Sequence, residues 1–150
     1  MKVAIACDHR GYECKRKIVP FLKGKGHELS DLGCEGNSPC DYPDFALPAA
    51  RMVAAGEMDV AILLDSSGIG MSVCANKVRG IRAAVVNDEV MARVARDANH
   101  CNVLCLGTDL LSQDQLMKIV EAFMETPFSD GRHVRRIEKI AEIERGIYGE

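Results

Sequence analysis

Short apolar runs alternate with amphipathic segments along the whole chain. Five runs have the length and composition of buried strands, and the third is almost entirely apolar, which is typical of a strand covered on both faces of a parallel sheet. The expected strands span residues 2–7, 27–32, 59–64, 81–86 and 102–106. The expected helices span residues 12–25, 43–55, 89–97, 112–125 and 134–146, and a further helix starts within the turn at residues 66–70 and ends near residue 77. Asp88 can cap the helix over residues 89–97. This alternation predicts one α/β domain over residues 1–150, with a doubly wound, Rossmann-like parallel sheet and helices on both faces.

Composition and charge exclude several classes of protein. Apolar residues make up 47% of the 150 residues, and the net charge is −3, without a long basic run. A nucleic-acid partner is therefore not expected, although a local cationic pocket for a small anion remains open. No apolar segment approaches the roughly 18 residues of a membrane span, and the first residues run into a charged cluster. We expect a cytoplasmic protein without a signal peptide.

The seven cysteines do not form a recognisable metal or redox motif. No Cys-x-x-Cys pair and no zinc-site spacing occurs. In a reducing compartment such residues are free thiols that pack as small hydrophobic groups. We expect no metal site.

Three polar clusters flank predicted strands. Residues 8–11 follow the first strand, residues 65–72 follow the third, and residues 97–102 precede the last. Ligands of doubly wound sheets bind beyond the carboxyl ends of the strands, where the strand order reverses. These clusters are therefore the candidate site.

The glycine-rich turn at residues 65–72 is the strongest local signal. Glycines let backbone N–H groups approach a phosphate, a carboxylate or a developing enolate oxygen. The turn lacks the Gly-Lys-Ser/Thr ending of a P-loop and a full Gly-x-Gly-x-x-Gly fingerprint. The alternative is a tight strand-to-helix turn without a ligand.

The side chains around this turn each allow two interpretations. Asp65 is either a helix N-cap or a general base whose pKa is raised by burial. His9 either binds phosphate or caps the first strand. A basic group near the C-terminus is either a solvated helix start or a phosphate clamp, because guanidinium binds phosphate in a bidentate manner. Its members are Arg132, His133, Arg135 and Arg136.

Seven segments, in order along the chain, resemble the family of ribose-5-phosphate isomerase type B and galactose-6-phosphate isomerase. They are IACDHRGY (5–12), DYPDFA (41–46), GIGMS (68–72), ANKV (75–78), GIRAA (80–84), NVLCLG (102–107) and GRH (131–133). The resemblance runs nearly end to end. It implies a Rossmann-like sheet, dimers or tetramers with active sites between subunits, a C-terminal helix packed on a neighbouring subunit, and no metal or nucleotide cofactor.

The resemblance also implies proton transfer between adjacent carbons of a phosphorylated sugar through a cis-enediolate. His9, Arg132 and Arg136 hold the phosphate, with the arginines reaching a neighbouring subunit's site. The backbone amides from Ser67 to Ser72 stabilise the enediolate oxygen. The implied substrate-binding residues are Asp8, His9, Tyr42, Gly68, Ile69, Gly70, Met71, Ser72, Asn99, Arg132 and Arg136, and the catalytic residues are Asp65 and Ser67.

The chain departs from the family pattern at the base. Commoner members have Cys-Gly-Thr-Gly where this chain has residues 65–68, and that cysteine transfers the proton. Other members place a glutamate base where this chain has Met71. Asp65 is then the only carboxylate where the base is expected, as in one subunit type of galactose-6-phosphate isomerase.

A second departure concerns ring opening. The family histidine that opens the furanose ring falls at Ala98, with His100 two residues further on. A pentose or hexose phosphate is mostly cyclic, whereas a tetrose 4-phosphate cannot close a furanose. The sequence therefore predicts an aldose–ketose isomerase of a tetrose, pentose or hexose phosphate. The alternatives are a partner subunit that completes a paralogue's site and a regulator that binds sugar phosphates.

Overall fold

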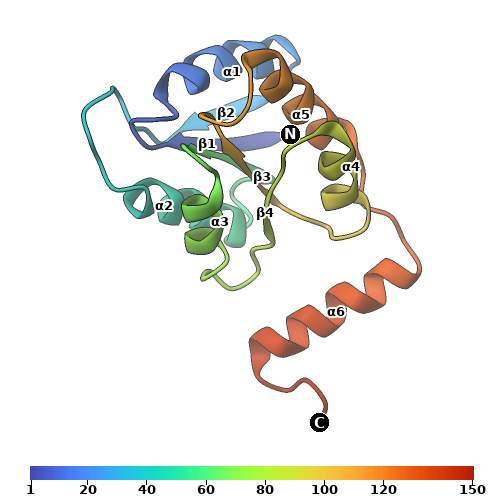
Figure 1. Cartoon of the computed structure of the whole chain (residues 1–150). Coiled ribbons are helices and arrows are strands. Elements are labelled where there is room, and N and C mark those ends of the chain that lie inside the picture. The colour runs from blue at the N-terminus through green and yellow to red at the C-terminus, as the bar shows by residue number, and fades with distance from the viewer.

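Five parallel strands form the centre of the computed structural model, which describes residues 1–150 (Figure 1). The strand order is β2-β1-β3-β5-β4, and every neighbouring pair is parallel. The strands are β1 (Lys2–Cys7), β2 (Glu28–Asp31), β3 (Val60–Asp65), β4 (Ala83–Val85) and β5 (Val103–Gly107). The predicted doubly wound parallel sheet is confirmed, and the two edge strands are shorter than expected, with four residues in β2 and three in β4.

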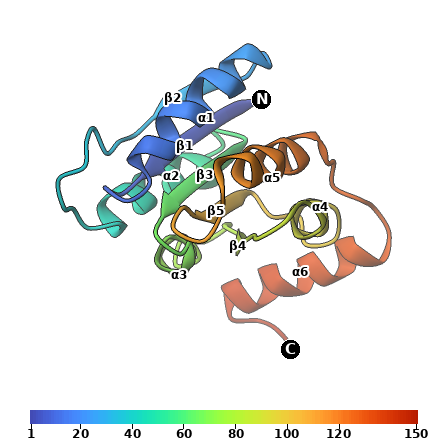
Figure 2. The same cartoon turned by 45° about the horizontal axis from the view of Figure 1, so that its top comes forward.

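Six helices surround or flank the sheet. They are α1 (Tyr12–Gly24), α2 (Pro43–Ala54), α3 (Ile69–Ala75), α4 (Glu89–Asp97), α5 (Gln113–Glu125) and α6 (Arg132–Arg145). Helices α1, α4 and α5 cover one face and α2 and α3 the other, whereas α6 stands apart from the sheet (Figures 1 and 2). None of the helices combines the length and the apolar character needed to cross a membrane.

The two helix starts with side-chain caps follow from local chemistry. The predicted cap of α4 is confirmed, because Asp88 Oδ1 accepts the Met91 N–H at 2.7 Å. Helix α5 begins with a capping box that our sequence interpretation did not include. Ser112 Oγ accepts the Gln115 N–H at 3.2 Å, and the Gln115 side chain accepts the Ser112 N–H at 2.8 Å.

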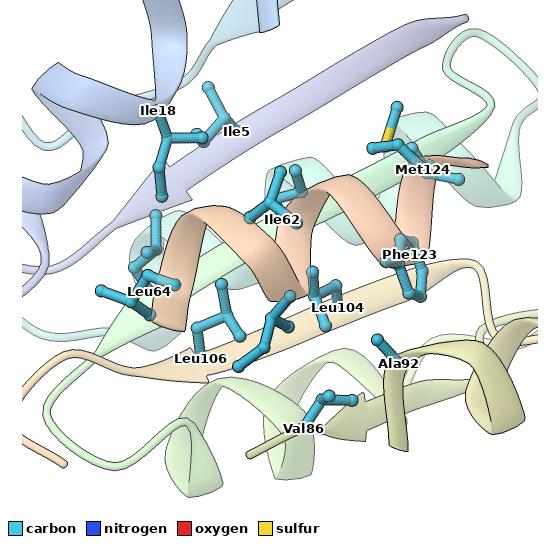
Figure 3. Packing of buried hydrophobic residues seen from close by; sticks show 14 of the residues in the cluster. Ile5, Ile18, Ile62, Leu64, Val86, Ala92, Leu104, Leu106, Phe123 and Met124 are labelled. Atoms are coloured by element: carbon cyan, nitrogen blue, oxygen red, sulfur yellow. The ribbon is translucent and has the colours of Figure 1, made fainter. Parts of the chain in front are cut away.

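Alternate residues of the central strands point to opposite faces and build two hydrophobic cores. On one face, Ile5, Ile62 and Leu104 belong to a cluster with α1, α4 and α5. Figure 3 shows these strand residues together with Phe123 and Met124 of α5. On the other face lies a second cluster, which α2 and α3 cover with many small side chains. Its fully buried residues include Ala4, Ala6, Ala46, Ala49, Ala50, Ala61 and Ala75.

The strand order reverses between β1 and β3, which makes this pair the topological switch point. Cys7 lies opposite Leu64 in the register, and the Asp8 N–H donates to Leu64 O at 3.1 Å. The next residue along each chain segment is an aspartate: Asp8 directly follows β1, and Asp65 is the last residue of β3. Asp8 and Asp65 are both nearly buried, with exposed fractions of 6% and 4%.

Gly11 lets α1 start directly above this pair of strands. A Cβ atom at residue 11 would lie 2.6 Å from Leu64 O and 2.8 Å from Cys7 Cβ. The Leu64 backbone and the buried Cys7 side chain therefore leave no room for any side chain at residue 11.

We predict that Gly11→Ala lowers the free energy of unfolding by about 1–3 kcal/mol, because overpacking must push α1 away from the sheet. Gly24→Ala is the matched control, since nothing lies within 4 Å of the added methyl group and its helical position favours alanine. Chemical denaturation of both variants measures the effect. Equal stability of the two variants would contradict the close-packing argument.

Candidate active site

Asp65 ends the central strand β3 with its carboxylate directed at the following turn. Its Oδ1 accepts the Gly68 N–H. Burial is the largest influence on the pKa of Asp65 and raises it, and the nearby Asp8 raises it further. The amides of Gly68, Met71 and Ser67 lower the pKa but do not outweigh burial. The Asp65 side chain thus stabilises the turn by a hydrogen bond. Its raised pKa also means that it binds a proton more tightly than an ordinary aspartate does.

The turn after Asp65 offers fewer free amides than the sequence implied. Gly68 has φ +78°, and α3 begins at the next residue. The Ile69 N–H donates to Ser67 Oγ at 3.2 Å, and the Ser72 N–H donates to Gly68 O at 3.0 Å as a helical hydrogen bond. The N–H groups of Ile69 and Ser72 therefore already have acceptors within the chain. The Gly70 N–H, by contrast, has no acceptor in the chain.

The Tyr42 ring lies against Gly70 from the start of α2. A Cβ atom at residue 70 would lie 2.7 Å from Tyr42 Cζ, so the ring rests directly on Gly70. The tyrosine side chain remains partly exposed. The structure therefore places Tyr42 beside the turn and explains why a glycine occupies residue 70.

Asp8 and His9 occupy the turn after β1. Asp8 Oδ1 accepts the Arg10 N–H at 2.9 Å. His9 Nδ1 lies 3.2 Å from the Cys40 backbone nitrogen and accepts its N–H. A neutral imidazole with Nδ1 as acceptor carries its proton on Nε2. The His9 ring is therefore set to donate a hydrogen bond from its other nitrogen.

The loop after β5 completes this edge of the sheet, and our sequence interpretation missed it. The Thr108 N–H donates to Asp65 O at 2.8 Å, and the Asp109 N–H donates to Ser66 O at 3.1 Å. A Cβ atom at Gly107 would lie 2.8 Å from the Ser67 carbonyl carbon. The rule that ligands bind beyond the carboxyl ends of strands applies to β5 as well and is the signal that points to this loop.

Asn99, Arg132 and Arg136 lie elsewhere in the chain. Asn99 follows α4 and precedes β5, so it is near the amino ends of the strands. The start of α6, which contains both arginines, also lies on that side of the molecule (Figures 1 and 2). Both arginines are exposed and form no hydrogen bond or ion pair. One chain therefore holds two separated halves of the predicted site.

The His100 side chain makes its contacts within its own chain. Its ring stacks on Phe128 with centroids 4.5 Å apart, and Nε2 lies 2.8 Å from Ser129 O. These contacts fix the imidazole to the segment between α5 and α6. His100 is therefore not placed beside Asp65 as a ring-opening acid.

A groove of about 630 Å³ separates α6 from α4 and β4. It is mostly apolar, and α6 has no buried residue. The lining residues are Asn76, Ile81, Arg82, Ala83, Ala84, Val85, Val86, Val90, Met91, Val94, Ala95, Asn99, Cys101, Ile140, Ile143 and Glu144. No group of three or more His, Cys, Asp or Glu side chains is arranged to hold a metal ion.

Comparison with known proteins gives one consistent answer. The chain is 38% identical over 144 residues to ribose-5-phosphate isomerase B of Escherichia coli, covering 96% of this chain and 97% of that protein. The structure of ribose-5-phosphate isomerase B from Clostridium thermocellum superimposes with a TM-score of 0.95 at 45% identity, covering 97% and 99% of the two chains.

The structure of the Mycoplasma genitalium enzyme with bound ribulose-5-phosphate superimposes with a TM-score of 0.92 at 39% identity, covering 96% of each chain. The family model described as Ribose/Galactose Isomerase matches residues 3–140. Together with the switch-point site, these matches show that the chain belongs to the ribose/galactose isomerase family.

Proposed function

We propose that this protein is an aldose–ketose isomerase that acts on a phosphorylated sugar through a cis-enediolate, with Asp65 as the base. The observation that carries the proposal is the buried Asp65 carboxylate, whose pKa is raised, beside the free amide of Gly70. A base with increased proton affinity and an adjacent donor for a developing oxyanion are the two groups that enolisation requires.

In the proposed reaction, Asp65 removes the proton from C2 of the aldose, and the electron pair forms the C1–C2 double bond of the enediolate. The Gly70 N–H stabilises the negative oxygen. Asp65 then returns the proton to C1, while a proton moves from the C2 oxygen to the C1 oxygen, which gives the ketose. Carboxylates act as bases in the same way in triosephosphate isomerase.

The remaining residues of this half of the site bind the substrate. Asp8 and Tyr42 lie where they can contact sugar hydroxyl groups, and Ser67 supports the turn. His9 donates from Nε2 to the phosphate, because its Nδ1 already accepts the Cys40 N–H.

The size of the sugar follows from two observations. The relatives are named for ribose-5-phosphate, and one neighbour binds ribulose-5-phosphate, which favours a five-carbon substrate. Ala98 and the occupied ring of His100 leave no evident acid for ring opening. We infer that the enzyme takes the open-chain form. The relatives favour a pentose 5-phosphate, and the missing ring-opening acid favours a tetrose 4-phosphate, which cannot close a furanose.

The second half of the site comes from another copy of the chain. Arg132, Arg136 and Asn99 cannot reach His9 within one chain, and the apolar groove beside α6 leaves Val90 and Ile143 exposed at 68% and 59%. A second copy that covers this groove removes apolar surface from water and can bring its arginines to the phosphate. We therefore infer a homodimer or a larger homo-oligomer with shared active sites.

We predict that Asp65→Asn folds, still binds phosphorylated sugar and loses at least about a hundredfold in turnover, the low end of the contribution of a general base. The amide oxygen of asparagine can still accept the Gly68 N–H but cannot take a proton. Proton exchange at C2 and ketose formation measure the loss over a panel of tetrose, pentose and hexose phosphates. Asp59→Asn is the control, because Asp59 also binds a backbone N–H, that of Lys2, but at the opposite end of β3.

The pH dependence of these variants separates a base from a structural cap. As the pH falls through the raised pKa of Asp65, the base becomes protonated and turnover must fall. The folded state holds this proton more tightly than the unfolded state, so the contribution of Asp65 to stability is lost as the pH rises through that pKa. Asp65→Asn therefore should not lower stability at neutral pH. Near-full turnover of the variant would make Asp65 only a cap.

We predict that Arg136→Ala weakens binding of the phosphorylated sugar by about one to two powers of ten, because a hydrogen bond to a charged group contributes about 1.5–3 kcal/mol. Arg135→Ala, on the same exposed helix, is the matched control. Calorimetric titration with a sugar phosphate measures both. Unchanged affinity after Arg136→Ala removes this residue from the site.

We predict that Ile143→Glu, which places a charge in the groove beside α6, converts the oligomer to monomers and abolishes most of the turnover. Sedimentation and activity are measured on the same sample, with circular dichroism to verify folding. A monomer that still turns over substrate would contradict the shared site. Activity that appears only after a paralogue is added would instead favour the partner-subunit interpretation.

A further inference from the structure

Arg10 is a cation at the edge of the sheet where the site lies. The side chains that follow β1, β3 and β5 include three carboxylates, those of Asp8, Asp65 and Asp109. A sugar phosphate with about two negative charges needs cations at this edge. Within one chain, the same three loops supply only His9 and Arg10.

The backbone of Arg10 is fixed on both sides. Its N–H donates to Asp8 Oδ1 at 2.9 Å, and its carbonyl oxygen accepts the Thr108 hydroxyl at 3.1 Å. The side chain, by contrast, is 54% exposed and forms an ion pair with Asp109. A fixed backbone and a solvent-accessible guanidinium suit a residue that binds a ligand.

Asp109 keeps that guanidinium close to the glycine-rich turn. Its own N–H donates to Ser66 O at 3.1 Å, so the carboxylate is anchored beside the residue that follows Asp65. Only one terminal nitrogen of Arg10, Nη2, contacts Asp109. The guanidinium has five N–H donors, which leaves another edge free for an anion.

Holding the loops together does not explain the ion pair between Arg10 and Asp109. The loop after β5 is already tied to its neighbours by the Thr108 and Asp109 backbone amides and by the Thr108 hydroxyl. Exposed ion pairs contribute little to stability.

We propose that Arg10 binds the substrate's phosphate together with His9, in the same chain as Asp65, and that Asp109 positions the Arg10 guanidinium for it. This inference rests on the proposed function. Guanidinium binds phosphate through two parallel hydrogen bonds, and the phosphate is the more highly charged partner, so it is bound while Asp109 retains the other edge. The phosphate is thereby held by cations of both copies.

The test compares four variants by calorimetric titration with inorganic phosphate and by steady-state kinetics. Arg10→Gln keeps most of the stem and removes the charge. It should raise the Kd for phosphate at least about tenfold, which corresponds to about 1.4 kcal/mol, and raise KM with little change in kcat. Arg10→Lys should recover part of the loss, because it restores the charge without the bidentate geometry.

Asp109→Asn tests whether Arg10 binds phosphate or whether its ion pair with Asp109 only stabilises the loops. The asparagine oxygen can still accept from Arg10, while a negative charge near the phosphate is removed, so phosphate should bind at least as tightly as before. Arg16→Gln is the remote control and should change nothing, because Arg16 is an exposed arginine of α1 that pairs with Glu13.

Two results overturn the proposal. Arg10→Gln that binds phosphate like the unmutated protein removes Arg10 from the site, and equal losses in Arg10→Gln and Asp109→Asn reduce the pair to a structural contact. Failure of the unmutated protein to bind phosphate or to convert any sugar phosphate refutes the proposed function as well. Normal turnover of the unmutated protein with an unaffected Arg10→Gln refutes only the role of Arg10.

Discussion

The parallel pairing of β1 with β3 is the constraint on which the rest of the site depends. Its register places Cys7 opposite Leu64, and the Asp8 N–H continues the ladder to Leu64 O. Asp8 and Asp65 consequently lie at the carboxyl ends of neighbouring strands, where burial raises the pKa of Asp65 and the charge of Asp8 adds to the effect. The close approach of Gly11 to the same strands fixes where α1 begins and hence where His9 lies.

Much of the fold was predictable because its local signals agree with one another. The apolar strand around Ile62 and the Asp88 cap each have one consistent interpretation. The edge strand β4 is shorter than its apolar run because it pairs with β5 over only three residues, from Ala83 to Val85. The pattern of apolar residues alone does not show how many residues of a run form hydrogen bonds with a neighbouring strand.

The sequence suggested candidate residues for the site but not their contacts. Asp65, Gly70 and Tyr42 were candidates from the sequence and its family resemblance, whereas the amides that remain free depend on which acceptor lies nearest to each N–H. The Ser72 N–H is used by the α3 helix and the Ile69 N–H by the Ser67 hydroxyl, which sequence cannot reveal. Thr108 and Asp109 belong to no recognisable motif, and only their place at the carboxyl end of β5 points to them. The separation of Asn99 and the arginines from Asp65 likewise required the three-dimensional path of the chain.

The contact between His9 and Cys40 also determines which changes the site tolerates. The imidazole tautomer is set by a backbone N–H and not by the cysteine thiol, which lies 3.9 Å from the same nitrogen. The position of the Nε2 proton of His9 therefore does not depend on the chemical nature of side chain 40. Nearly any amino acid there preserves the donor, and proline, which has no N–H, is the one type that removes it.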